Sequence, residues 1–160
     1  MKREIEGKEY ATEPSKAGLV VSDFVANYRV KTRFPGNMTS GELISAIEKG
    51  LPFQELVALQ ESFGVSLERL AGILGMAKAT LNRRRVQGRL IPEESDRIVR
   101  FARLMSKAVE VLESEDQARL WLTCPQTGLG GAIPLEYART EVGAREVDDL
   151  LSRIEYGVYA

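Results

Sequence analysis

The sequence contains no histidine and a single cysteine, Cys124, among its 160 residues. The absence of histidine excludes Ser-His-Asp and Cys-His nucleophiles, which need an imidazole as general base, and every metal site with a histidine ligand. One cysteine permits no disulfide within the chain and leaves too few ligands for zinc. We therefore expect no catalytic residue, no metal site, no cofactor and no enzymatic activity.

Long apolar runs are also missing. No run approaches the ~18 apolar residues that a membrane-spanning helix needs. The first ten residues, MKREIEGKEY, lack the apolar centre of a signal peptide. We expect a protein that does not associate with membranes and that resides in the cytoplasm.

Charge of either sign is present in balance, but it is unevenly distributed. The formal net charge is −1, from 22 lysines and arginines against 23 aspartates and glutamates. Residues 77–89 carry five bases and no acid, whereas residues 90–160 carry thirteen acids and eight bases. A basic segment indicates binding to a polyanion such as nucleic acid, and an acidic surface often contacts a basic partner.

Capping and helix-breaking residues divide the chain into helices and leave no convincing strand pair. Thr39 stands three residues before Glu42, as in a capping box, and Gly50 ends the helix that follows. Such signals predict helices over residues 39–50, 52–63, 67–74, 77–87, 93–113, 115–123, 134–138 and a last segment that begins after Gly143. The apolar spacing of residues 19–34 fits one short helix, with a strand as the alternative. The predicted fold class is all-α. The 93–113 helix is apolar on more than one side, and we expect its apolar faces to form the contact of a dimer.

Residues 67–85 have the spacing of a helix-turn-helix. Two helices that cross at a steep angle need a small residue where they touch, which Ala71 supplies. The turn needs a residue that tolerates a left-handed conformation, which Gly75 supplies. The apolar residues expected to hold the two helices together are Leu70, Leu74, Met76 and Leu81.

The second helix of this motif carries side chains suited to DNA. Arg and Lys can bond guanine, Asn can bond adenine, and Ala leaves room for a thymine methyl group. The predicted base-reading residues are Lys78, Ala79, Asn82 and Arg83. The predicted phosphate-binding residues are Thr80, Arg84, Arg85 and Arg89. The alternative is that residues 83–85 form only a solvated basic surface. The position of Arg84 is often apolar in such helices, which predicts looser packing at this helix end.

Two further features each admit two interpretations. The Gly-rich segment 127–131 superficially resembles a nucleotide-binding loop, but no Lys-Ser/Thr follows it. A connection between two helices that is shaped by glycine is the preferred interpretation. Trp121 either packs in the core or anchors an interface.

A series of short motifs, in a fixed order, resembles a known family. After the helix-turn-helix come RxxGRLxPEESDRIxRxAR at 85–103 and shorter motifs at 118–122, 129–131, 134–135, 140–144 and 154–159. On these motifs, about residues 41–160 resemble the Xre/MbcA/ParS family of type II antitoxins. Residues 1–38 lie outside the resemblance.

The resemblance implies an Xre-type helix-turn-helix DNA-binding domain followed by a small helical toxin-binding domain. The implied organisation is an unassigned N-terminal extension at 1–38, a DNA-binding and dimerisation region at 39–106 and a toxin-binding domain at 107–160. The implied partners are operator DNA of the protein's own operon and a RES-type toxin that destroys NAD. A homodimer is expected because operators of such proteins are usually symmetric. The expected toxin-binding residues are Trp121, Leu129, Gly130, Glu155, Tyr156, Val158, Tyr159 and Ala160.

The chain end suggests a way to block the toxin. Tyr156 and Tyr159 offer flat aromatic surface for a nicotinamide or adenine site, and the carboxylate of Ala160 could pair with a basic phosphate-binding group. The alternative is that both tyrosines pack back on their own chain. Two rival functions stay open: a stand-alone helix-turn-helix transcription regulator with a dimerising or ligand-sensing C-terminal domain, and an enzyme with its site at the Gly-rich loop.

Overall fold

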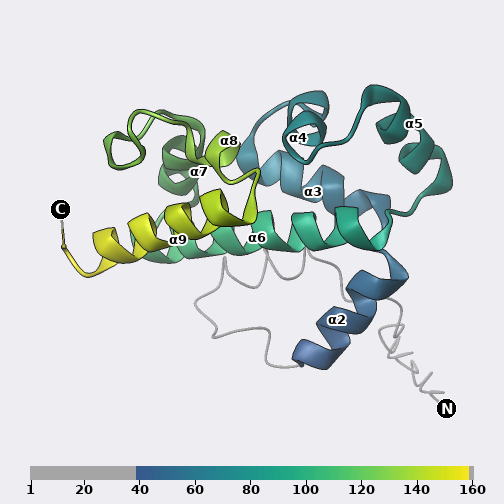
Figure 1. The fold of residues 1–160 in the computed structure, drawn as a ribbon, viewed down its shortest axis with the longest axis horizontal. Helices are drawn as coiled ribbons and strands as arrows, with labels where there is room; N and C mark the ends of the chain where they lie inside the picture. Colours follow the sequence, from purple (N-terminus) through teal and green to yellow (C-terminus); the bar gives the residue numbers. More distant parts are fainter. Residues whose placement is uncertain (1–38, 159–160) are drawn as a thin grey trace, which may run out of the picture.

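The computed structural model describes residues 39–158, and every regular element in this part of the chain is helical (Figure 1). It contains eight α-helices, one 3-10 helix and two isolated β-bridges, which confirms the predicted all-α fold. The helix predicted at 19–34 lies outside the described residues. None of the helices between residues 39 and 158 combines the length and the apolar character needed to cross a membrane. The elements are α2 (Ser40–Lys49), α3 (Phe53–Phe63), α4 (Leu67–Ile73), α5 (Lys78–Gln87), α6 (Pro92–Leu112), α7 (Glu115–Thr123), η1 (Thr127–Leu129), α8 (Pro134–Tyr137) and α9 (Glu141–Glu155).

Four of the eight α-helices between residues 39 and 158, namely α2, α4, α7 and α9, begin after a residue whose side chain caps the first turn. At α2 the Thr39 hydroxyl accepts the amide of Glu42, and the Glu42 carboxylate accepts the amide of Thr39 at 2.6 Å, which confirms the capping box. The side chains of Ser66, Ser114 and Thr140 cap α4, α7 and α9 by accepting a backbone amide three residues on. Each cap satisfies an amide that has no partner within the helix.

The prediction that Gly143 precedes the last helix is wrong. Thr140 caps this helix and α9 begins at Glu141, so Gly143 lies inside its first turn. A Cβ atom at this position would lie 1.9 Å from the carbonyl oxygen of Tyr137. The glycine is therefore needed for the close approach of the α8 end to α9, and not as a helix boundary.

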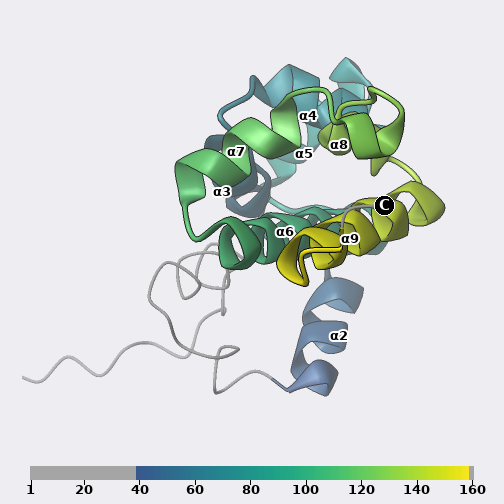
Figure 2. The same ribbon diagram turned by 90° about the vertical axis from the view of Figure 1, so that its left-hand side faces the viewer.

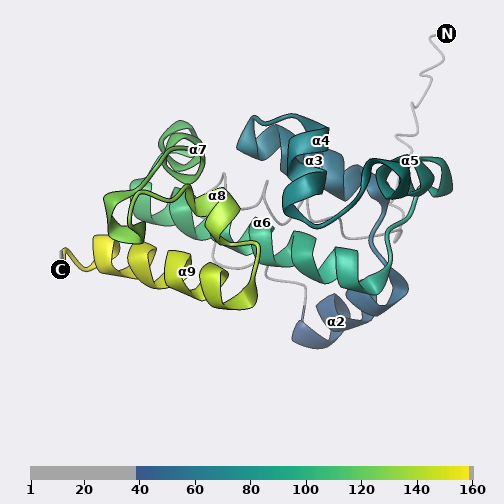
Figure 3. The same cartoon turned by 45° about the horizontal axis from the view of Figure 1, so that its top comes forward.

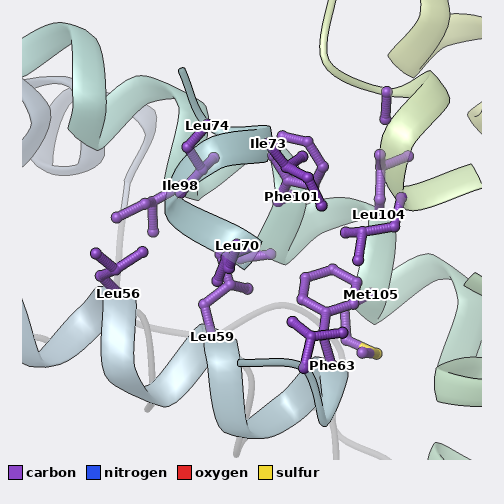
Figure 4. Close-up of a cluster of buried hydrophobic side chains, with 14 of the residues drawn as sticks. Leu56, Leu59, Phe63, Leu70, Ile73, Leu74, Ile98, Phe101, Leu104 and Met105 are labelled. Atoms are coloured by element: carbon purple, nitrogen blue, oxygen red, sulfur yellow. The ribbon is translucent and has the colours of Figure 1, made fainter. Parts of the chain in front are cut away.

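The long helix α6 is the central element of the fold (Figures 1 and 3). It packs against α2, α3, α7 and α9. Apolar side chains of α3, α4 and α6 meet in one cluster (Figure 4), in which the rings of Phe63 and Phe101 pack edge to face with their centroids 6.3 Å apart. This core joins the helix-turn-helix to the C-terminal helices mainly through α6, and an ion pair between Arg69 of α4 and Glu136 of α8 links the two regions directly.

Most of the apolar side chains of α6 are covered by helices of the same chain, which leaves less of its surface for the predicted dimer contact. Ile98, Phe101, Ala102 and Met105 are each at most 2% exposed. Side chains that are buried within the protomer are not available to a second copy unless the core opens. The dimer contact predicted on this helix stays a prediction, and it is left with the half-buried side chains Val109, Val111 and Leu112.

Helix α2 stands apart from the other helices that pack on α6. Figure 2 shows it on the opposite side of α6 from α3, α4 and α5. None of its residues is buried, and Ile44 is 55% exposed. The helix-turn-helix and the C-terminal helices thus share one side of α6, with α9 alongside α6.

Candidate functional site

The turn between α4 and α5 is held by backbone and side-chain hydrogen bonds. Gly75 adopts a φ of 76°, the left-handed conformation predicted for it. The amide of Met76 donates to the carbonyl oxygen of Ala71 at 2.8 Å, and Ala71 is 2% exposed. Arg97 of α6 donates to the carbonyl oxygen of Leu74 at 2.7 Å, which satisfies the end of α4. These bonds fix the angle at which α5 leaves the turn.

The apolar side of the motif is buried as the sequence predicts. Leu70, Leu74, Met76 and Leu81 are between 0% and 6% exposed. They join the core cluster that also contains side chains of α3 and α6. The helix-turn-helix therefore rests on the body of the protein, and α5 turns its other side to solvent.

That outer side carries most of the predicted DNA-binding residues. Of the seven that lie on α5, five are exposed and one, Thr80, is half-buried. The exposed residues on α5 are Lys78, Ala79, Asn82, Arg83 and Arg85. Within residues 77–89 no acid stands among them. The structure thus brings base-reading and phosphate-binding candidates onto one accessible basic surface.

Arg84 does not belong to this surface, and its predicted contact with phosphate is corrected. The residue is 8% exposed, and its guanidinium forms an ion pair with Glu94 of α6, with Nε 2.7 Å from Oε2. The same guanidinium donates to the side chain of Gln87 at 2.9 Å. Its donors face protein groups, so the residue holds α5 against α6 and leaves phosphate contact to its neighbours.

Arg89 is exposed but also has a structural task. Its guanidinium donates to the carbonyl oxygens of Gly50 at 2.6 Å and of Lys49 at 3.2 Å. These carbonyl groups end α2, so the side chain links the end of the helix-turn-helix to the connection between α2 and α3. Arg89 remains a candidate for phosphate contact through its exposed part.

Sequence reasoning missed Val86, which lies on the outer side of α5 and is 89% exposed. The helical spacing could have identified it, because Val86 follows Ala79 by seven residues and Arg83 by three and so lies on the same helix face. Val86 was not predicted because an apolar side chain, unlike arginine or asparagine, does not by its type indicate DNA binding.

The Gly-rich segment forms a compact connection between α7 and α8. The Gln126 side chain donates to the carbonyl oxygen of Trp121 at 2.9 Å, and its backbone pairs with Ala132. A Cβ atom on Gly128 would lie 2.7 Å from the Leu150 side chain, so the segment packs closely on α9. The glycines shape a connection between helices, which was the preferred interpretation.

Trp121 is half-buried, in part as predicted for a core residue, while its role as an interface anchor stays a prediction. It packs against the core cluster, and it also lines a cavity of about 350 Å³ between α7, the Gly-rich segment and α9. The side chains around this cavity are Trp121, Gln126, Thr127, Gly128, Leu150, Arg153, Ile154 and Val158. The cavity thus brings together two of the predicted toxin-binding residues, Trp121 and Val158.

The other predicted toxin-binding residues differ in exposure. Leu129 is half-buried, and Gly130, Glu155 and Tyr156 are exposed, with Tyr156 at 77%. Tyr159 and Ala160 lie outside the described residues. Leu120 on α7 is 56% exposed and was not predicted, although its place next to Trp121 in a short helix could have drawn attention to it.

The two candidate surfaces lie at opposite ends of the molecule. Figures 1 and 3 place α5 at one end of the long axis, and the end of α9 with the Gly-rich segment at the other. Helix α6 runs between them and packs on helices of both regions. One ligand at each end would therefore not compete directly for the same side chains.

A helix-turn-helix joined through a shared helix to further C-terminal helices defines a helix-turn-helix protein with an additional helical domain. Two family models match these regions: the antitoxin Xre-like helix-turn-helix domain over residues 42–103, and the antitoxin Xre/MbcA/ParS C-terminal toxin-binding domain over residues 107–157. The chain therefore belongs to the Xre antitoxin family, as its motifs predicted.

Three relatives named Antitoxin Xre match most of the chain. The protein of Yersinia enterocolitica serotype O:8 / biotype 1B is 34% identical over 120 residues, which cover 74% of this chain and 81% of the relative. The protein of Photorhabdus laumondii subsp. laumondii is 35% identical over 130 residues, covering 78% and 85%. The protein of Pseudomonas putida is 23% identical over 142 residues, covering 89% and 80%.

Proposed function

We propose that this chain neutralises a RES-type toxin that degrades NAD and represses its own operon by binding promoter DNA. The protein is not an enzyme in this proposal, and it acts in the cytoplasm. The observation that carries the proposal is the placement of an exposed basic helix and of a matched toxin-binding domain at opposite ends of one body.

The DNA-binding part of the proposal rests on α5. Asn82 and Arg83 would read base edges, while Arg85 and Arg89 would contact phosphates. The exposure of these side chains and the rigid attachment of α5 to α6 support this assignment. A helix held at a fixed angle loses little freedom when it enters a groove, so more of its contact energy contributes to affinity.

The toxin-binding part rests on the end of the molecule formed by α7, the Gly-rich segment and α9. A toxin that binds NAD needs an electropositive pocket for the pyrophosphate, so an acidic partner with exposed aromatic residues is complementary to it. We propose that residues 154–160 reach this pocket and that Tyr156 and Tyr159 cover part of it. Exposed apolar side chains at this end, including Tyr156 and Leu120, support a protein contact there.

We propose that the chain divides into a DNA-binding and dimerisation region at 39–106 and a toxin-binding region at 107–160, with 1–38 as an extension without assigned role. Because α6 (Pro92–Leu112) crosses this boundary, the two regions differ in proposed function but share one hydrophobic core. A homodimer would place two copies of α5 on a symmetric operator.

The test is co-expression of the full chain with the gene next to it, followed by size-exclusion chromatography with mass measurement. The purified material is then assayed for NAD degradation and for binding to the DNA upstream of the operon. We expect a stable complex that is inactive toward NAD and that shifts its own promoter. Promoter binding without any protein partner would favour the stand-alone regulator instead. Nucleotide turnover by the chain alone would favour the enzyme.

A further inference from the structure

We propose that Val86 reads a thymine methyl group in the operator and lies at the centre of the base-contacting face of α5. This inference rests on the DNA binding proposed above and adds a specificity-determining residue to it. Among the described residues, Val86 is the most exposed large apolar side chain, at 89%. A single exposed valine means little by itself, so the argument depends on where this one stands.

The geometry of α5 places Val86 on its outer face. Each residue of an α-helix turns by about 100°, so residues at i, i+3, i+4 and i+7 share a face. Ala79, Asn82, Arg83 and Val86 have this spacing, and all four are exposed. Val86 also lies about 160° around the helix from Arg84, whose side chain is buried against α6.

The charges around Val86 favour DNA over a protein as its partner. The basic residues nearest to it on the exposed side of α5 are Arg83 and Arg85, and residues 77–89 contain no acid. An apolar protein surface would have to cover these cations without pairing them, which costs free energy. DNA offers phosphates to the arginines and, in the major groove, the C5-methyl group of thymine to an apolar side chain.

The backbone around Val86 is held in place. The ion pair between Arg84 and Glu94 ties α5 to α6, and the carbonyl oxygen of Gly88 accepts the amide of Phe53 at 3.0 Å. Valine is β-branched and strongly prefers one χ1 rotamer in a helix. Its two methyl groups are therefore presented at nearly fixed positions, as selective contact with one methyl group of a base requires.

The test compares thymine with deoxyuridine, which differs only by the absence of the C5-methyl group. Duplexes that bind the full chain are first selected from a random library. Each thymine of the selected duplex is then replaced in turn, and affinities are measured at one salt concentration for the wild type, Val86→Ala and Val142→Ala. Val142 is the matched control, because it is 72% exposed but stands on α9.

We expect the wild type to lose affinity about fourfold at one thymine of each half-site, the value of one buried methyl group (~0.8 kcal/mol, at 1.4 kcal/mol per tenfold). Val86→Ala should bind the unmodified duplex at least that much more weakly and should show no thymine–deoxyuridine difference at that position. Val142→Ala should reproduce the wild type.

Two outcomes would overturn the inference, and they are distinguishable. If Val86→Ala keeps the wild-type sensitivity at every thymine, Val86 does not read a methyl group, while the proposed DNA binding stands. If the full chain enriches no sequence from the library, specific DNA binding fails and the inference fails with it. Circular dichroism of Val86→Ala shows whether the variant keeps its helical structure, so weaker binding can be separated from loss of the fold.

Discussion

The guanidinium of Arg84 and the carboxylate of Glu94 form a buried ion pair, with Nε 2.7 Å from Oε2, between the second helix of the helix-turn-helix and the start of α6. Glu94 also accepts the backbone amide of Ile91 at 3.0 Å, so one carboxylate orients Arg84 and begins α6. This pair explains how an arginine occupies a position that is often apolar in such helices without loosening the packing.

We predict that Glu94→Ala lowers the free energy of unfolding by about 3–5 kcal/mol, because it leaves the guanidinium of Arg84 buried without its counter-ion. Urea denaturation measures the change. Glu93→Ala is the control, since Glu93 is exposed and adjacent, and it should change the free energy by less than about 0.5 kcal/mol. Equal effects of both substitutions would mean that the pair contributes no more than surface charge.

The exposed residues of α5 should separate into two classes when they are replaced. Asn82→Ala and Arg83→Ala should each cost about 1–3 kcal/mol of specific DNA affinity and relax the base preference. Arg85→Ala should weaken binding to all sequences and lower the slope of affinity against salt by about one. Titrations of specific and random duplexes over a range of salt concentrations distinguish the two. A uniform loss for all three variants would contradict the assignment of readout residues.

Gly143→Ala should destabilise the protein although alanine is the better helix former. The added Cβ atom would lie 1.9 Å from the carbonyl oxygen of Tyr137, so α8 must move away from α9, at a cost of about 1–3 kcal/mol. Thermal unfolding provides the measurement. Gly72→Ala is the opposite case, because a Cβ atom there would meet nothing within 4 Å beyond the backbone of its own helix, and it should stabilise by about 0.5–1 kcal/mol.

Deletion of residues 158–160 tests the proposed plug. The complex with the toxin should still form, because the rest of the helical body remains, but NAD should be consumed. Pull-down from co-expressing cells reports complex formation, and NAD levels report inhibition. Full inhibition by the shortened chain would exclude the plug and assign inhibition to the helical body.

Sequence alone determined most of the helices between residues 39 and 158, because the signals that begin and end them act within a few residues. The capping box requires only that Glu42 follows Thr39 by three residues. The turn at Gly75 requires only a residue that tolerates a left-handed conformation. The helix-turn-helix followed for the same reason, since Leu70, Leu74 and Leu81 are placed by the period of two adjacent helices.

Tertiary structure alone decided which basic residues face solvent and which surfaces stay free. Arg83, Arg84 and Arg85 are equivalent in the sequence, yet only Arg84 turns inward, because Glu94 at the start of another helix neutralises it there. The need for glycine at position 143 likewise comes from tertiary structure, because a side chain there would collide with the carbonyl oxygen of Tyr137 in α8. Whether a side chain is buried or paired depends on which segments, distant in the sequence, lie against it in the fold. The local periodicity of the sequence does not contain this information.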